Sequence, residues 1–122
     1  EDLAKRAENI NHSGCDVFIS IHVNKYQTND VNGPMVYYEK DNEYSYLLSK
    51  SVQKELNILS NKNKIVHYSD FYLFRKCDKP GIFVECGFIS NDEERNKLLN
   101  EKYQQSLVDA LYQGIYNYYL NK

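Results

Sequence analysis

Two short apolar segments of the chain each carry a side chain suited to metal or proton chemistry. The segment Phe18-Ile19-Ser20-Ile21-His22-Val23-Asn24 contains a histidine, and the segment from Ile82 to Asn91 contains Glu85. Both are rich in β-branched and aromatic residues, which predicts two buried strands with a polar residue toward the carboxyl end of each. Because open α/β sheets bind ligands at the carboxyl ends of their strands, we expect His22 and Glu85 to face one crevice.

The elements that must position these two residues follow from the apolar patterns. The strand expected from Asp16 to Val23 is largely apolar on both faces, as is typical of a strand covered by helices on both sides. Further strands are predicted at 34–38 and through Glu85, and a strand or extended segment at 71–75. Helices are predicted at 3–10, 42–59, 90–99 and from Glu101 onward. The order predicts an α/β fold, with a mainly parallel sheet flanked by helices on both faces in a three-layer sandwich.

The chain is expected to be one incomplete domain. Its 122 residues, 42% hydrophobic and 26% charged, are ordinary for a single globular core. The opening segment from Glu1 to Ile10 has helical spacing of apolar residues but no evident cap before it. We therefore expect residues 1–122 to be the C-terminal portion of a longer domain.

The charge pattern argues against two classes of partner. The formal net charge is −2, and lysines and arginines are scattered along the sequence rather than clustered, so no nucleic-acid footprint is predicted. No apolar stretch approaches the roughly 20 residues that a membrane-spanning helix needs. The sequence predicts no transmembrane segment.

The three cysteines are expected to be free thiols. Cys15, Cys77 and Cys86 are too few and too irregularly spaced for a disulfide framework or a cysteine-based zinc site. Cys86 follows Glu85 directly, so a cysteine hydrolase that uses Cys86 with a histidine base is one alternative function.

Each candidate residue also has a plain structural interpretation. His22 could be a hydrogen-bonded histidine at a strand end, and Glu85 could form an ion pair with Arg75. Asn24 could orient a ligand or bind a substrate amide, or it could begin the polar loop from Asn24 to Gly33. Arg75 could bind a substrate carboxylate, or it could be a solvated strand end.

Four motifs in order carry a family resemblance. They are Ser20-Ile21-His22-Val23-Asn24, Gly33 before a Tyr-Tyr strand, Leu73-Phe74-Arg75, and the run from Val84 to Glu93, in which Ser90 and Glu93 resemble a helix capping box. Together they resemble the zinc-dependent N-acetylmuramoyl-L-alanine amidases, especially those of spore-forming bacteria that process spore cortex. The resemblance makes residues 1–122 the C-terminal portion of an amidase catalytic domain.

The resemblance implies a mechanism and a substrate. It implies that His22 is a zinc ligand, that Glu85 is the catalytic carboxylate, and that the cofactor is one zinc ion. The implied reaction is hydrolysis of the amide between N-acetylmuramic acid and the L-alanine of the peptidoglycan stem peptide. It also implies an exported protein of the cell envelope, cell wall or spore cortex, with a regulatory protein as a possible partner.

The chain departs from the family pattern in its metal ligands. The family's other histidine and glutamate ligands precede the region covered here, so the remaining zinc ligands are expected in a missing N-terminal segment. With His22 as its one ligand, this fragment alone is expected to bind zinc poorly and to be inactive. The departure also supports a rival function, a metal-free cell-wall-binding module or regulatory pseudoenzyme.

Overall fold

The fold is an α/β arrangement with one four-stranded sheet. The computed structural model describes residues 2–25 and 32–122. The elements, in chain order, are α1 (Leu3–His12), β1 (Phe18–Asn24), β2 (Met35–Glu39), α2 (Glu43–Ser60), β3 (His67–Ser69), α3 (Tyr72–Lys76), β4 (Gly81–Phe88), α4 (Asp92–Leu98) and α5 (Glu101–Leu120). Most of the predicted polar loop after Asn24 lies outside the described residues.

The sheet is mixed rather than uniformly parallel. Its strand order is β1-β4-β2-β3, with β1 parallel to β4, β2 parallel to β3, and β2 antiparallel to β4. The predicted α/β class is therefore confirmed, and two of the three strand pairings are parallel. The sequence did not predict the antiparallel pairing of β2 with β4.

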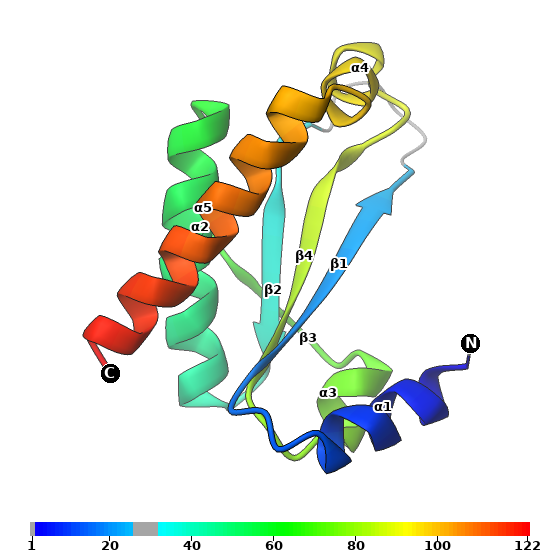
Figure 1. Ribbon diagram of the computed structural model, residues 1–122, viewed down its shortest axis with the longest axis vertical. Coiled ribbons are helices and arrows are strands. Elements are labelled where there is room, and N and C mark those ends of the chain that lie inside the picture. Colours follow the sequence, from blue (N-terminus) through cyan, green and yellow to red (C-terminus); the bar gives the residue numbers. More distant parts are fainter. Residues whose placement is uncertain (1, 26–31) are drawn as a thin grey trace.

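Helices cover both faces of the sheet, as expected. Alternate residues of β2 and β4, among them Val36, Ile82 and Val84, pack with Leu48 of α2 and Leu107 of α5 in the main core. On the opposite face, α1 and α3 bury a smaller apolar cluster around Phe18. Figure 1 shows α2 and α5 side by side along the sheet, and α1 beside α3 at the end where β1 and β4 begin.

The prediction for the segment 71–75 is wrong. A strand or extended segment was expected, but residues 72–75 belong to the short helix α3, and the strand is formed by residues 67–69. A short apolar run does not reveal by its periodicity whether it is a strand or a helix. Here packing decides, because the helical turn buries Leu73 and Phe74 together with Ala7 of α1.

Two helix starts also differ from expectation. The cap of α4 is Asn91, whose Oδ1 accepts a hydrogen bond from the Glu94 backbone N at 3.0 Å, so the predicted capping box of Ser90 and Glu93 is wrong by one residue. The first helix has a cap as well, because Asp2 accepts a hydrogen bond from the Lys5 backbone N at 2.8 Å. Both caps satisfy an amide that the first helical turn leaves free.

Candidate active site

His22 and Glu85 lie next to each other, as the sequence predicted. They are Cα partners in the parallel pair β1 and β4. Since partners in a sheet point to the same face, their side chains share the face on which the His22 ring stacks against Phe83, with ring centroids 3.8 Å apart. Met35 of β2 faces Glu85 from the other side. The site is therefore built on three strands of the sheet.

Glu85 is a buried carboxylate without a compensating partner. Its side chain is 6% exposed, and Oε2 has no hydrogen-bond partner among the residues that the structure describes. Burial raises the pKa of this carboxyl above its ordinary value, because a charge in a poorly solvated place is unfavourable. An unpaired buried carboxylate costs stability, which favours a functional role over a structural one.

The alternative ion pair between Glu85 and Arg75 is wrong. Arg75 is exposed on α3, where its Nη1 lies 2.9 Å from Asp70 Oδ1 and also donates to the Asp70 backbone oxygen. Its guanidinium lies over the ring of Tyr72. Arg75 is not among the residues that line the pocket beside His22, so nothing in the fold brings it to the site, and its substrate-binding role stays a prediction.

The surroundings of His22 disfavour the charged form of its imidazole. Burial lowers its pKa below the ordinary value, and the nearby positive charge of Arg6 adds to this effect. Its Nε2 shares a hydrogen bond of 2.6 Å with Ser20 Oγ. Neutral imidazole is the form that binds metal ions, so His22 has the chemistry that a metal ligand requires, and its role as a ligand stays a prediction.

A small apolar pocket adjoins His22. Its volume is about 210 Å³, and its walls come from α1, β1, α3 and Phe83 of β4. His22 is one of the lining residues, so a group bound in this pocket would lie beside the imidazole.

A buried carboxylate that sequence reasoning missed holds the end of β4. Glu94 is 8% exposed and accepts hydrogen bonds from the backbone N of Phe88, at 2.7 Å, and from the backbone N of Gly33. Gly87 permits this approach, since a Cβ there would lie 3.0 Å from Glu94 Oε1. The sequence signal was present in the Asn91 cap, which places Glu94 in the first turn of α4, but the predicted Ser90 cap assigned that position to Glu93.

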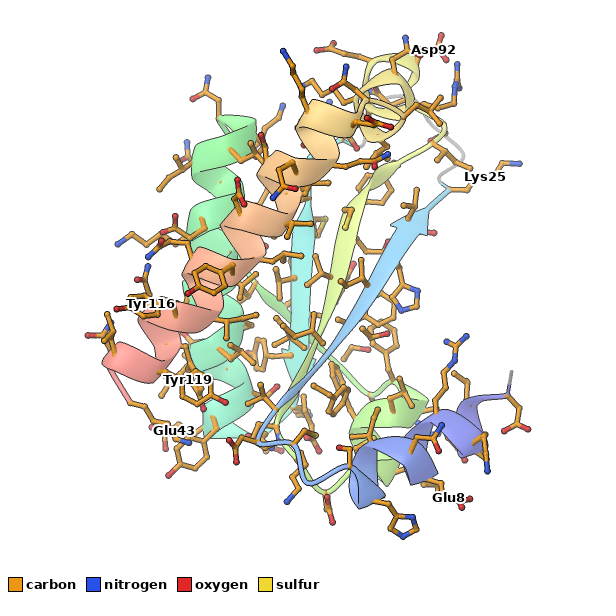
Figure 2. The ribbon with its side chains drawn as sticks, in the orientation of Figure 1. Glu8, Lys25, Glu43, Asp92, Tyr116 and Tyr119 are labelled. Atoms are coloured by element: carbon orange, nitrogen blue, oxygen red, sulfur yellow. The ribbon has the colours of Figure 1, made fainter. Side chains whose placement is uncertain are left out.

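The strand pairing is irregular at this same place. The register passes from His22–Glu85 to Asn24–Phe88, so β4 carries one extra residue beside the site. Bulges of this kind re-aim side chains and are common beside active sites. Figure 2 places Asp92 of α4 and Lys25, which follows β1, at the same end of the sheet. Because Glu94 accepts hydrogen bonds from the backbone N of Gly33 and of Phe88, it connects the segment before β2 to the bulged end of β4.

Asn24 lies at the end of β1, where its side-chain oxygen accepts a hydrogen bond from the Lys25 backbone N at 2.8 Å. Its backbone oxygen accepts from the Ile89 backbone N at 2.9 Å, which fastens β1 to the segment after β4. These contacts are structural, and a role for Asn24 toward substrate stays a prediction.

Cys86 does not have the surroundings of a nucleophile. It lies in the main core with Val84, and burial, together with the neighbouring Glu85, raises its pKa to about 11. A thiol with this pKa is protonated at neutral pH, whereas the thiolate is the nucleophile. The cysteine-hydrolase alternative is therefore disfavoured.

Comparison with known proteins identifies the family. The family model described as N-acetylmuramoyl-L-alanine amidase matches residues 1–117. The chain belongs to this amidase family. The resemblance carried by the motifs around His22 and Glu85 is thus confirmed.

Individual amidases agree with this assignment. A germination-specific N-acetylmuramoyl-L-alanine amidase of Bacillus subtilis (strain 168) is 33% identical over 124 residues, which cover 100% of this chain and 52% of that protein. The chain therefore spans about half the length of this curated relative.

Solved amidase structures share the fold. The CwlD amidase from Clostridioides difficile, solved in complex with the GerS lipoprotein, is 34% identical with a TM-score of 0.93, over 98% of this chain and 62% of that one. An N-acetylmuramoyl-L-alanine amidase from Clostridium difficile 630 is 30% identical with a TM-score of 0.91, over 100% of this chain and 67% of that one.

The amidase family is generally zinc-dependent. Within residues 2–25 and 32–122, no three histidine, cysteine, aspartate or glutamate side chains are grouped so that they could hold a metal ion. Among the same residues, no helix is long and apolar enough to span a membrane.

Proposed function

We propose that the protein containing this chain hydrolyses peptidoglycan at the amide between N-acetylmuramic acid and the L-alanine of the stem peptide. The observation that carries the proposal is the unpaired, buried Glu85 carboxylate beside the neutral His22 imidazole, in a chain of the amidase family. A general base and a metal ligand on neighbouring strands suit a metal-dependent amide hydrolase.

In this proposal Glu85 moves the protons. Its carboxylate accepts a proton from the attacking water and then returns it to the departing amine nitrogen, so one residue serves both half-steps. The raised pKa of Glu85 brings its proton affinity closer to neutral pH, where transfer in both directions is efficient. The Phe83 ring, stacked on His22, keeps the imidazole in place beside the carboxylate.

His22 is the residue of this chain that would hold one zinc ion, through a ring nitrogen. When bound, zinc supplies Lewis-acid chemistry that polarises the amide carbonyl and makes water a stronger acid. The remaining ligands are assigned to a segment preceding this chain. On its own, the chain is therefore proposed to bind zinc poorly and to be inactive.

The cellular setting is proposed from the relatives. The name of the Bacillus subtilis relative specifies germination, which supports an exported protein that acts in the cell envelope, on cell wall or spore cortex. The Clostridioides difficile relative was solved with a lipoprotein, which supports a regulatory protein partner for this amidase too.

The rival function is a metal-free cell-wall-binding module or regulatory pseudoenzyme. Zinc stoichiometry and release of L-alanine-terminated peptides from purified peptidoglycan, measured on the full-length protein and on residues 1–122 alone, separate the two. The amidase proposal expects one zinc ion and peptide release in the longer protein only. If the full-length protein binds peptidoglycan but no zinc, the function is that of a cell-wall-binding module or regulatory pseudoenzyme.

A further inference from the structure

A large groove lies away from the candidate active site. Its volume is about 1190 Å³, and its walls are formed by α2, the segment that follows α2, and the C-terminal end of α5. The groove shares no residue with the pocket beside His22. Since α2 and α5 pack on the sheet face opposite His22 and Glu85, this groove is separate from the proposed chemistry.

The groove is positively charged, in contrast to the chain. Among the described residues, its lining includes Lys50, Lys54, Lys62 and Lys64 and no aspartate or glutamate, whereas the chain has a net charge of −2. Burial lowers the pKa of Lys64, and the charge of Glu94, which does not line the groove, partly offsets this effect. Lys62 also lines a small second pocket with Glu93 and Glu94, so Lys50 and Lys54 of α2 are the groove cations on which attraction of an anionic ligand rests.

The wall that carries Lys62 and Lys64 is fixed before any ligand arrives. The Asn57 side chain accepts a hydrogen bond from the Lys64 backbone N at 3.2 Å and donates one to the Lys64 backbone oxygen at 2.9 Å. Buried Gln53 donates to Asn57 Oδ1 at 3.0 Å, and Asn61 ends α2 in the left-handed conformation with φ 55°. A prearranged wall lowers the entropic cost of binding.

The groove also offers faces for sugar rings. Tyr38 and Tyr46 meet edge to face with centroids 5.0 Å apart, and the Lys50 ammonium lies 5.5 Å from the Tyr46 ring centre. Ile58 and Ile65, which also line the groove, are 68% and 71% exposed. Aromatic and aliphatic surface beside cations suits a ligand with apolar ring faces and negative charges.

We propose that this groove binds an acidic glycan, specifically the glycan strand that the amidase reaction leaves behind. The inference rests on the proposed function. Amide hydrolysis consumes one water and breaks the bond between the lactyl carbonyl and the alanine nitrogen, which leaves a lactyl carboxylate on the glycan and an ammonium group on the peptide. Each muramic acid processed therefore gains one negative charge, which the groove lysines can pair, while Tyr38 and Tyr46 contact the sugar rings.

The test is a binding measurement on the full-length protein with soluble glycan strands from which the stem peptides have been removed. Calorimetry compares strands with free lactyl carboxylates, the same strands with methyl-esterified carboxylates, and uncharged N-acetylglucosamine oligomers. The free-carboxylate strands should bind best, and their affinity should fall as salt screens the charges. The double variant Lys50→Gln/Lys54→Gln should weaken that binding about tenfold or more.

The matched control is Lys5→Gln/Lys102→Gln, which changes the net charge equally at two residues outside the groove lining. This control should leave glycan affinity within about twofold, since exposed charges at a distance are screened. Equal weakening by both double variants, or equal binding of esterified and free strands, would overturn the proposal. Preferential binding of the released peptide would also overturn it.

The result of this binding measurement does not depend on whether the protein cleaves peptidoglycan. A protein that binds the carboxylate strands through the groove but cleaves no peptidoglycan would contradict the proposed function, not the charge preference of the groove. A protein that releases peptide but does not bind these strands would contradict the groove assignment alone.

Discussion

Glu85 and His22 are direct partners across two parallel strands, and only one of them has its hydrogen-bonding needs met. His22 shares a hydrogen bond with Ser20 and stacks on Phe83, whereas Glu85 Oε2 has no partner among the described residues. The pair therefore combines a positioned imidazole with a carboxylate whose second oxygen is left without a protein partner.

Replacing Glu85 by glutamine should separate chemistry from folding. The amide keeps the shape of the side chain but cannot accept a proton, so peptide release by the full-length protein should fall about 10²- to 10⁴-fold. Thermal unfolding should not shift to lower temperature, because the change removes a buried acid rather than a contact. The measurements are peptide release and calorimetric unfolding, and wild-type activity in this variant would refute the role of Glu85.

Glu85 should also make stability depend on pH. Its pKa is raised in the folded state, so the folded state binds a proton more tightly than the unfolded state. The resulting stabilisation is present below the ordinary carboxyl pKa of 4.5 and is lost as pH rises through the folded pKa. Urea unfolding should show the wild type losing stability relative to Glu85→Gln between acid and neutral pH.

His22 should make stability depend on pH in the opposite direction to Glu85, so it serves as an internal control. Its pKa is lowered from 6.5 in the folded state, so its contribution is present above that value and is lost as pH falls. The stability of the wild type relative to His22→Gln should therefore fall as pH is lowered below 6.5. A difference between wild type and variant that does not change with pH would contradict the burial argument for that residue.

Glu94→Gln should loosen the end of β4. The ionised acceptor of the Phe88 and Gly33 amides is lost, which should lower the free energy of unfolding by about 1–3 kcal/mol. Hydrogen exchange should accelerate at these two amides in particular. The control is Glu93→Gln, whose side chain is 83% exposed and which should change stability by less than about 0.5 kcal/mol. Unchanged exchange at Phe88 would show that Glu94 does not hold the strand.

Gly114→Ala tests the contact between the two long helices. A Cβ at Gly114 would lie 2.6 Å from Val52 Cα, so α2 and α5 would have to move apart. Overpacking of this kind costs about 1–3 kcal/mol in unfolding free energy despite the better helix propensity of alanine. Urea unfolding checks this, with the exposed neighbour Gln113→Ala as the control. Equal stability of the two variants would mean that the helices adjust freely.

Local patterns in the sequence were enough to predict much of this protein. The apolar run from Asp16 to Val23 predicted a strand covered by helices on both faces, and the pattern after Glu101 predicted the helix α5. The position of Glu85 at the end of a buried strand indicated that it would meet His22. These features follow from the periodicity of helices and strands. That periodicity spans only a few residues, so it can be recognised in the sequence alone.

Tertiary packing decided the rest. The run 71–75 became helical because Leu73 and Phe74 could be buried against α1, and Glu94 acquired its role because two distant backbone amides converge on it. The segment after α2 turns back along the helix, so that Lys62 and Lys64 line the same groove as Lys50 and Lys54 of α2. Such features depend on which residues meet across the fold, and the free energy of those long-range contacts is not contained in any local pattern.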